Sequence, residues 1–262
     1  MGKPGFLFLG HFIAYYGLMI VIGIVVAALI AYVQVRRFHL DWNDFLIICA
    51  TFGLFCMLGA KILYLIVSLP AIELERLSDF SYVSTLMSGG FVFYGGFIGI
   101  FPALYLCQKK LRISVSKYIQ YCTGCFPIAH GFGRIGCYLV GCCHGIPYDG
   151  WLSVTYSDSL YAPNGVGLLP VQLLEAFGEF AIGGLLLYRS KKTKGISAIA
   201  TYMILYSVMR FWLEYLRGDF IRGIFYRFST SQVISIVIFV IGVGMYNRNS
   251  VSEKNVDESI DK

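Results

Sequence analysis

The chain has 262 residues, of which 57% are hydrophobic and only 14% charged, and its formal net charge is +6. A soluble domain has about 25% charged residues, so this composition excludes an ordinary soluble protein. The positive residues stand in short segments between apolar runs rather than along one face, and we therefore expect no nucleic acid partner.

The apolar residues form seven runs, each near the length that crosses about 30 Å of hydrocarbon as a helix. The first run is too long for a signal peptide, and no small-residue cleavage site follows it, so we expect it to be retained. The fourth contains Pro127 and several glycines, which predict a bent or interrupted helix. The sequence thus predicts an all-α integral membrane protein with about seven transmembrane helices, near residues 12–34, 45–69, 89–108, 115–141, 168–188, 196–216 and 230–246.

Basic residues predict how these helices are oriented. They follow the first, third and fifth runs, and with seven spans all three groups lie on one side of the membrane. The groups are Arg36 and Arg37, then Lys109, Lys110 and Arg112, then Arg189, Lys191, Lys192 and Lys194. Loops rich in lysine and arginine face the cytoplasm. We therefore expect the N-terminus outside, the C-terminus in the cytoplasm, and the longer loops near 70–88, 142–167 and 217–229 outside.

The chain contains no visible internal repeat or linker. Residues 1–247 are therefore expected to form a single polytopic membrane domain. The last residues are polar and have no apolar period, so residues 248–262 are expected to form a disordered cytoplasmic tail.

Several ionisable residues fall inside the predicted helices, where each costs on the order of 3 kcal/mol and needs a partner or a function. Arg210 and Glu214 are four residues apart, so they share a helix face and can pair. Glu175 and Glu179 are also four residues apart, and two like charges on one helix face need a cation opposite them. Arg134 or Lys61 can supply that cation. Arginine in a membrane cavity suits a lipid phosphate, although a transporter uses the same residue types.

Glycines and cysteines are the other unusual residues of the apolar runs. The stretch "SGGFVFYGGFIGI" (88–100) has five glycines, which permit close helix packing or the approach of a ligand. The cysteines of "CTGC" (122–125) precede a second group formed by Cys137, Cys142, Cys143 and His144. Thiolates and imidazole suit zinc, but this spacing matches no standard zinc site. We therefore expect small buried cysteines, no bound metal and no cofactor.

Six segments of the chain, in order, resemble phosphatidylglycerol–prolipoprotein diacylglyceryl transferases, the bacterial membrane enzymes that lipidate a cysteine of lipoprotein precursors. Each segment is a weak signal alone, but six in order with seven predicted spans are specific. They are "YYGLM" (15–19), "GAKILY" (59–64), "SGGFVFYGGFIG" (88–99), "GRIGCYLVGCCHG" (133–145), "LPVQLLEA" (169–176) and "YSVMRFWLEYLRGD" (206–219).

The resemblance implies which residues act. The catalytic residues that it implies are Arg134, Arg210, Glu214, Tyr94 and Tyr206. The residues that it implies for substrate binding are Tyr16, Lys61, Gly95, Gly96, Gly145, Gln172 and Glu175.

This sequence departs from the family pattern at several of these segments. Tyr94 stands in place of a histidine, and Lys61 in place of an arginine. Cys137 and Val140 replace two asparagines, Cys142 a glutamate and Leu169 a second histidine. A tyrosine, with a pKa near 10, is a poor base. The candidate bases are then the nearby His130 and His144.

The resemblance implies the reaction. The diacylglyceryl group of phosphatidylglycerol moves to the thiol of a lipobox cysteine in a lipoprotein precursor, and glycerol phosphate leaves. The expected location is the bacterial cytoplasmic (inner) membrane, as a multi-pass protein. Three alternatives stay open: the same fold with a different acceptor, a non-catalytic phospholipid-binding or transport protein, and a thiol-redox protein that uses Cys122 and Cys125.

Overall fold

A computed structural model describes residues 2–73, 76, 78–193, 195–219, 224–225 and 228–260. These residues are mostly helical, as expected for an integral membrane protein. Within them, five helices are long and apolar enough to cross a membrane. They are α1 (Tyr15–Arg37), α2 (Trp42–Ser68), α7 (Val171–Arg189), α8 (Gly195–Leu213), which continues into the 3₁₀ turn η4 (Glu214–Leu216), and α9 (Thr230–Ile260).

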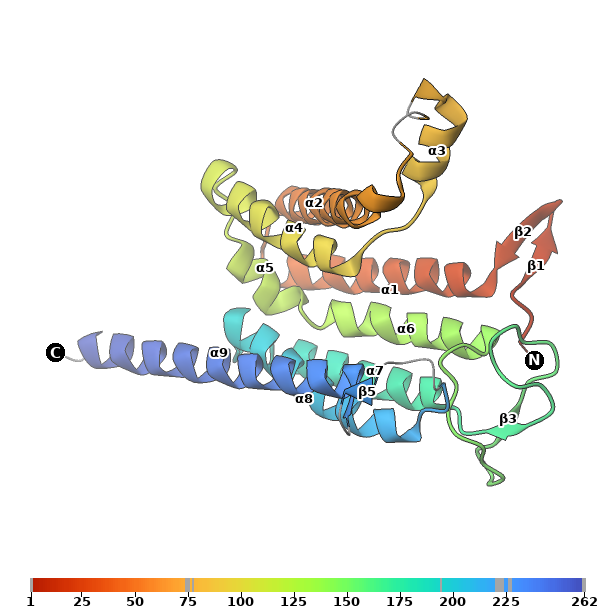
Figure 1. The fold of residues 1–262 in the computed structure, drawn as a ribbon. Coiled ribbons are helices and arrows are strands. Elements are labelled where there is room, and N and C mark those ends of the chain that lie inside the picture. Colours follow the sequence, from red (N-terminus) through yellow and green to blue (C-terminus); the bar gives the residue numbers. More distant parts are fainter. Residues whose placement is uncertain are drawn as a thin grey trace. The chain divides into compact units, whose positions relative to one another are not determined.

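The chain forms two compact units, one of residues 1–39 and 116–262 and one of residues 40–115. In the first unit α1 packs against α6 (Cys125–Val140), α6 against α7, α7 against α8, and α8 against α9 (Figure 1). In the second unit α2 packs against α4 (Phe93–Tyr105).

The second unit depends on glycines at the contact between its two long helices. A Cβ atom at Gly99 would collide with the carbonyl oxygen of Phe55, and one at Gly95 would collide with that of Gly59. The backbones of α2 and α4 therefore approach more closely than any larger residue permits. Of the two roles that the sequence left open, close packing is observed for Gly95 and Gly99.

Two short elements extend the second unit beyond this pair. Helix α2 ends in the 3₁₀ turn η1 (Leu69–Ala71), and α4 continues into the π-helical turn η3 (Leu106–Lys110). The predicted long connection near 70–88 contains a further helix, α3 (Phe80–Ser88), which the sequence analysis did not predict. The side chain of Asp79 accepts a hydrogen bond from the backbone N–H of Ser81, and this cap satisfies a donor at the start of α3.

The first unit also contains short strands, so the all-α prediction was too simple. Strands β1 (Gly5–Phe8) and β2 (His11–Ala14) form an antiparallel hairpin, joined by Leu9 and Gly10 at positive φ. A two-residue turn of this kind matches the twist of the paired strands. Pairing of β2 delays the first helix to Tyr15, whereas the sequence placed its start near residue 12. Two smaller antiparallel pairs join β3 (Val154–Thr155) with β4 (Gly167–Leu168) and β5 (Ile224–Phe225) with β6 (Phe228–Ser229).

The fourth predicted helix is interrupted, as the sequence predicted. It is divided into α5 (Val115–Cys122) and α6, with a turn at residues 123–124 between them. Pro127 lies in the first turn of α6. A proline there removes no hydrogen bond, because the first N–H groups of a helix have no partner within it.

The segment between α6 and α7 is folded onto the end of α6. The hydroxyl of Tyr156 donates to the carbonyl of Tyr138, and Ser159 donates to the carbonyl of Val140. Tyr156 also packs with Ala162 and Leu168 in a small apolar core. These contacts hold the residues that directly follow α6, including Cys142 to Gly145, in a defined position.

Three sequence predictions reach residues beyond those described, and the first is the predicted connection near 70–88, of which residues 74, 75 and 77 lie outside the described part. Residues 220–223 and 226–227 of the predicted outer loop lie outside the described part of the chain, as do 261–262 of the predicted tail. Helix α9 extends to Ile260. The division into a membrane domain up to residue 247 and a disordered tail stays a prediction.

We predict that Gly99→Ala lowers the thermal stability of the protein in detergent by about 1–3 kcal/mol, because the added methyl group forces α2 and α4 apart. Gly53→Ala is the matched control, since a Cβ atom at Gly53 meets no atom within 4 Å. Thermal unfolding followed by circular dichroism measures both variants. Equal melting temperatures for the two variants would show that the α2/α4 contact does not limit the thermal stability of the protein.

Candidate active site

Helices α6 and α7 face each other with charged side chains in matching positions. The Nδ1 atom of His130 lies 2.6 Å from a carboxylate oxygen of Glu179. Nη2 of Arg134 lies 3.2 Å from a carboxylate oxygen of Glu175. Each pair joins one side chain of α6 to one of α7. The two helices thus form successive polar contacts along one line.

Helical spacing explains this arrangement. His130 and Arg134 are four residues apart on α6, and Glu175 and Glu179 are four apart on α7. Residues at this spacing lie one turn apart on the same helix face. One turn further, Nε2 of Gln172 donates to the carbonyl oxygen of Cys142 at 2.8 Å. The line of polar contacts therefore extends from within α6 to the turn after it.

Helix α8 adds a second arginine to this line. Nη2 of Arg210 lies 2.7 Å from a carboxylate oxygen of Glu214, and its Nε lies 3.9 Å from Glu175. The start of α9 and the residue before it complete the group. Ser231 accepts a hydrogen bond from Arg210, and Ser229 donates to Glu214. The predicted Arg210–Glu214 pair is confirmed, as is Arg134 as the cation opposite Glu175.

Burial makes these contacts energetically important. Glu175 and Glu179 are 1% and 0% exposed, and Arg210 is 6% exposed. A buried charge costs several kcal/mol unless an opposite charge and hydrogen bonds compensate it. Removing one member of the group therefore leaves its partners with an unfavourable charge.

The arginines keep N–H donors that these contacts do not use. Among the residues that the structure describes, Nε of Arg134 and Nη1 of Arg210 have no hydrogen-bond partner, although both atoms are buried. Buried donors of this kind are normally satisfied. The two arginines therefore have the capacity to bind an anionic group.

Aromatic rings stand beside the charged group. The ring of Tyr206 lies 5.8 Å from that of His130, centroid to centroid, and it stacks on Tyr202 at 5.7 Å. Both tyrosines are on α8, four residues apart. They form an aromatic wall next to the imidazole.

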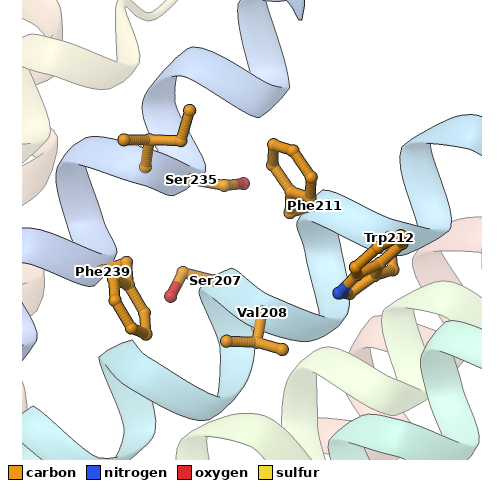
Figure 2. A pocket seen from close by; sticks show the side chains of 7 residues that line it. Ser207, Val208, Phe211, Trp212, Ser235 and Phe239 are labelled. Carbon is orange, nitrogen blue, oxygen red and sulfur yellow. The ribbon is translucent and has the colours of Figure 1, made fainter.

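An apolar groove of about 260 Å³ lies between α8 and α9. Figure 2 shows Ser207, Val208, Phe211 and Trp212 of α8 facing Ser235 and Phe239 of α9 across it. Two residues that line the groove, Ser207 and Phe211, are close to Arg210 in the sequence of α8. Ser235 likewise donates to the carbonyl of Ser231, the residue whose hydroxyl contacts that arginine.

Three thiols gather at the end of α6. The sulfur atoms of Cys137, Cys142 and Cys143 all lie within 4.8 Å of one another. The chain turns back at Gly141 and Cys143, which have φ angles of 86° and 58°. Hydrogen bonds from the other two thiols lower the pKa of Cys143 against the opposing effect of burial, and the Arg217 guanidinium lowers it further.

His144 follows this thiol cluster directly. Its Nδ1 lies 3.0 Å from the carbonyl oxygen of Gly145. A proton on Nδ1 in this contact would leave Nε2 as the acceptor. Gly145 itself donates to the carbonyl of Leu169, and a Cβ atom at this glycine would collide with that oxygen. Gly145 therefore permits the close approach of two backbone segments, and its role in substrate binding stays a prediction.

Four of the predicted site residues belong to the second unit. Lys61 is 8% exposed, and its Nζ donates to the carbonyl oxygens of Leu86 and Gly89. This side chain therefore holds the segment before α4. Gly95 packs against α2, Gly96 lies near the carbonyl of Cys56 in the same contact, and Tyr94 lies in the first turn of α4. Their functional roles stay predictions.

Tyr16 belongs to the first unit, at the start of α1. It is 45% exposed, and its backbone packs against Gly136 of α6, where a Cβ atom would lie 3.2 Å from the Tyr16 Cα. Contact with α6 therefore brings this predicted binding residue close to the helix that carries Arg134.

Three contacts were not predicted from the sequence. The pairing of His130 with Glu179 joins two residues 49 positions apart, and only the unbalanced carboxylate signalled it. Ser229 and Ser231 have no distinguishing pattern. Arg217 forms a two-point contact with Asp219, 2.9 and 2.8 Å long, and its proximity to Cys143 depends on the fold.

Comparison with known proteins adds independent information. A family model described as prolipoprotein diacylglyceryl transferase matches residues 4–248. A phosphatidylglycerol–prolipoprotein diacylglyceryl transferase of Clostridium tetani is 34% identical, over 88% of this chain and 91% of its own length. Transferase 2 of Clostridium perfringens is 35% identical, over 90% and 91%. That of Clostridioides difficile is 28% identical, over 97% and 100%.

We predict that Glu175→Gln destabilises the protein by about 3–5 kcal/mol, because the two arginines lose the carboxylate that they share. The matched control is Glu73→Gln, which removes an exposed ion pair with Arg76 and should have little effect. Melting temperatures in detergent compare the two variants. A Glu175→Gln variant as stable as the control would show that the cluster does not need this charge.

Proposed function

The chain belongs to the prolipoprotein diacylglyceryl transferase family, and from this premise we propose how its buried polar residues transfer a diacylglyceryl group to a lipoprotein precursor. The donor is phosphatidylglycerol, and the acceptor is a cysteine thiol. The sulfur attacks the glycerol carbon that bears the phosphate ester. The C–O bond breaks, its electron pair stays on the phosphate oxygen, and glycerol phosphate leaves.

The observation that carries the proposal is the arginine pair with unused donors. Arg134 and Arg210 both contact Glu175 and keep buried N–H groups without a partner among the described residues. A guanidinium matches the geometry of phosphate oxygens. We assign both arginines to the phosphate, where they stabilise the charge that builds up as the ester bond breaks. Glu214 fixes the orientation of Arg210 through their contact at 2.7 Å.

The apolar groove supports a lipid as the donor. Two of its lining residues, Ser207 and Phe211, lie near Arg210 in the sequence of α8, and its lining is apolar apart from two serines. A phospholipid with its phosphate at the arginine would place an acyl chain against Phe211 and Phe239. We propose this groove as the binding site of one acyl chain.

The order of residues along α6 indicates on which side of the phosphate each reacting group lies. His130, Arg134 and Cys137 follow one another at about one turn each on this helix. With the phosphate at Arg134, one reacting group lies toward His130 and the other toward the thiol cluster. We place the acceptor cysteine at the end of α6, beside His144, which accepts the proton of the thiol.

The glycerol end of the departing glycerol phosphate is then on the side of His130. A carboxylate at 2.6 Å, such as that of Glu179, is the partner that an imidazolium needs in a site of low dielectric constant. We propose that protonated His130 donates a hydrogen bond or its proton to the departing phosphate. Tyr206 orients the imidazole, with its ring centroid 5.8 Å away.

The other predicted residues complete the proposal. Tyr16, Gly145 and Gln172 border the proposed site in the first unit. For Lys61, Gly95 and Gly96 we retain the substrate-binding role, and for Tyr94 the catalytic role, that the family resemblance implies. Tyr94 supplies a hydrogen bond rather than a base.

We also propose the membrane topology of the chain. Five helices are long enough to span alone. Helix α4 with η3 covers residues 93–110 without interruption, and α5 with α6 covers most of 115–140. Counting these gives seven spans, and the basic loops place the N-terminus outside and the C-terminus in the cytoplasm. Residues 1–247 form one membrane domain of the bacterial cytoplasmic membrane, and 248–262 a cytoplasmic tail.

We predict that Arg134→Ala and Arg210→Ala each reduce transfer by at least about 100-fold, since each removes a donor to the leaving phosphate. Membranes that contain the protein, phosphatidylglycerol and a lipobox peptide are analysed by mass spectrometry for a diacylglyceryl adduct on the thiol. Arg76→Ala, which removes an exposed arginine, is the control.

Full activity in either buried-arginine variant would contradict the assignment of that arginine to the phosphate. Absence of the adduct with the folded unmodified protein would contradict the proposed acceptor and favour a different one, or lipid binding without transfer.

We predict that His130→Gln reduces the rate of transfer by about 100-fold or more, while the concentration of lipid at half-maximal rate changes little. Glutamine retains a hydrogen bond to Glu179 but carries no proton for the leaving group. His11→Gln in the exposed hairpin is the control. A rate equal to that of the control would exclude His130 from proton transfer.

A further inference from the structure

We propose that Cys137, Cys142 and Cys143 form a binding site for a zinc ion, whose fourth coordination position takes the thiolate of the acceptor cysteine. Zinc binding itself depends only on the geometry of this chain. The role of the fourth position rests on the proposed transfer reaction.

The positions of the three sulfur atoms fit this ion. Zinc binds thiolates at about 2.3 Å in a tetrahedral arrangement, which places two ligand sulfurs about 3.8 Å apart. The three sulfurs of the cluster are within 4.8 Å of one another. Only a small contraction of the cluster is therefore needed, and soft thiolate ligands select zinc over hard cations.

The surroundings of the three cysteines suit a charged metal site better than cysteines that only fill an apolar core. Cys142 and Cys143 are half-buried, whereas cysteines that only fill a core are usually buried completely. Arg217 lies within hydrogen-bonding reach of Cys143, and Arg134 is one turn from Cys137 on α6. Three thiolates with Zn²⁺ carry one net negative charge. The nearby guanidinium groups make the surroundings of this charge more favourable, although Arg217 also pairs with Asp219 and Arg134 with Glu175.

The turn after α6 is held in the conformation that gathers the sulfurs. Cys143 has a φ of 58°, a conformation that residues other than glycine rarely adopt. The carbonyl of Cys142 accepts a hydrogen bond from the buried Gln172 of α7. This hydrogen bond links the thiol cluster to the same face of α7 that carries Glu175.

Three protein ligands leave one position of a tetrahedral zinc ion open. Within the described part of the chain, the group contains no further cysteine and no histidine or acidic ligand atom. The neighbouring His144 has its Nδ1 at the carbonyl of Gly145. Zinc sites with three protein ligands bind water or substrate in the fourth position.

The chemistry of such an ion fits the acceptor. A thiol that coordinates zinc loses its proton. The proton passes to His144 or to water, and the zinc-bound sulfur keeps its electron pair for attack on the glycerol carbon. The C–O bond then breaks and glycerol phosphate leaves, with no change of oxidation state. This supplies the activation for which Tyr94 is poorly suited.

The test uses the full chain purified in detergent. Zinc is measured by plasma mass spectrometry, and cobalt(II) replaces zinc so that thiolate coordination can be followed by its charge-transfer absorption. The variant is Cys142→Ser with Cys143→Ser, and Cys56→Ser is the matched control, because Cys56 lies outside the cluster. We expect about one zinc per chain and the absorption band in the unmodified and control proteins, and loss of both in the double variant.

Two further measurements do not depend on whether the double variant folds. In the unmodified protein, a chelator should expose the three cluster thiols to alkylation, which mass spectrometry locates. A lipobox peptide should change the cobalt absorption without any lipid present, and the same peptide with serine should not.

Each result decides between the parts of the proposal. Equal metal content in all variants, or no metal and unchanged alkylation after chelation, overturns the zinc site. A cobalt spectrum that does not respond to the cysteine peptide overturns the role of the fourth position. Transfer that continues in chelated protein without metal overturns that role while the proposed function stands. Metal binding with a peptide response, but no transfer, supports the site and contradicts the proposed function.

Discussion

The structure of the candidate site depends on one constraint. Charges that are buried at low dielectric constant must be compensated by opposite charges. Glu175 lies between Arg134 and Arg210, with its nearest oxygen 3.2 and 3.9 Å from their nitrogens, and is almost fully buried. Buried charges require partners. The positions of α6, α7 and α8 are therefore coupled through this one carboxylate. The same contact holds two cations side by side, an arrangement that would be unfavourable without it.

The alignment of α6 and α7 sets the order of the proposed reacting groups along α6. His130 and Arg134 face Glu179 and Glu175, and the thiol cluster follows at the end of α6. The proposed acid His130, the phosphate-binding Arg134 and the proposed position of the acceptor thiol thus follow one another along α6. The rigid helix fixes their spacing, and rigid placement of reacting groups is a main source of catalysis.

Divergence from the family pattern is concentrated around this path. Tyr94 replaces the histidine that the resemblance assigns to the reaction, and Cys137 and Cys142 replace an asparagine and the glutamate. In the fold, the two cysteines lie together with Cys143 at the proposed acceptor end. The proposed zinc site would connect these departures, because a metal ion that activates the acceptor would replace a missing base.

The sequence by itself determined the membrane character, the interruption before Pro127 and the Arg210–Glu214 pair, because these depend on local composition and on a spacing of four residues. It could not determine which cation faces Glu179 or which cysteines meet. Those contacts join residues far apart in the chain, and only the packing of α6 on α7 and the turn after α6 decided them. The α3 helix and the N-terminal hairpin also required the structure, since short polar and mixed segments carry no strong periodicity.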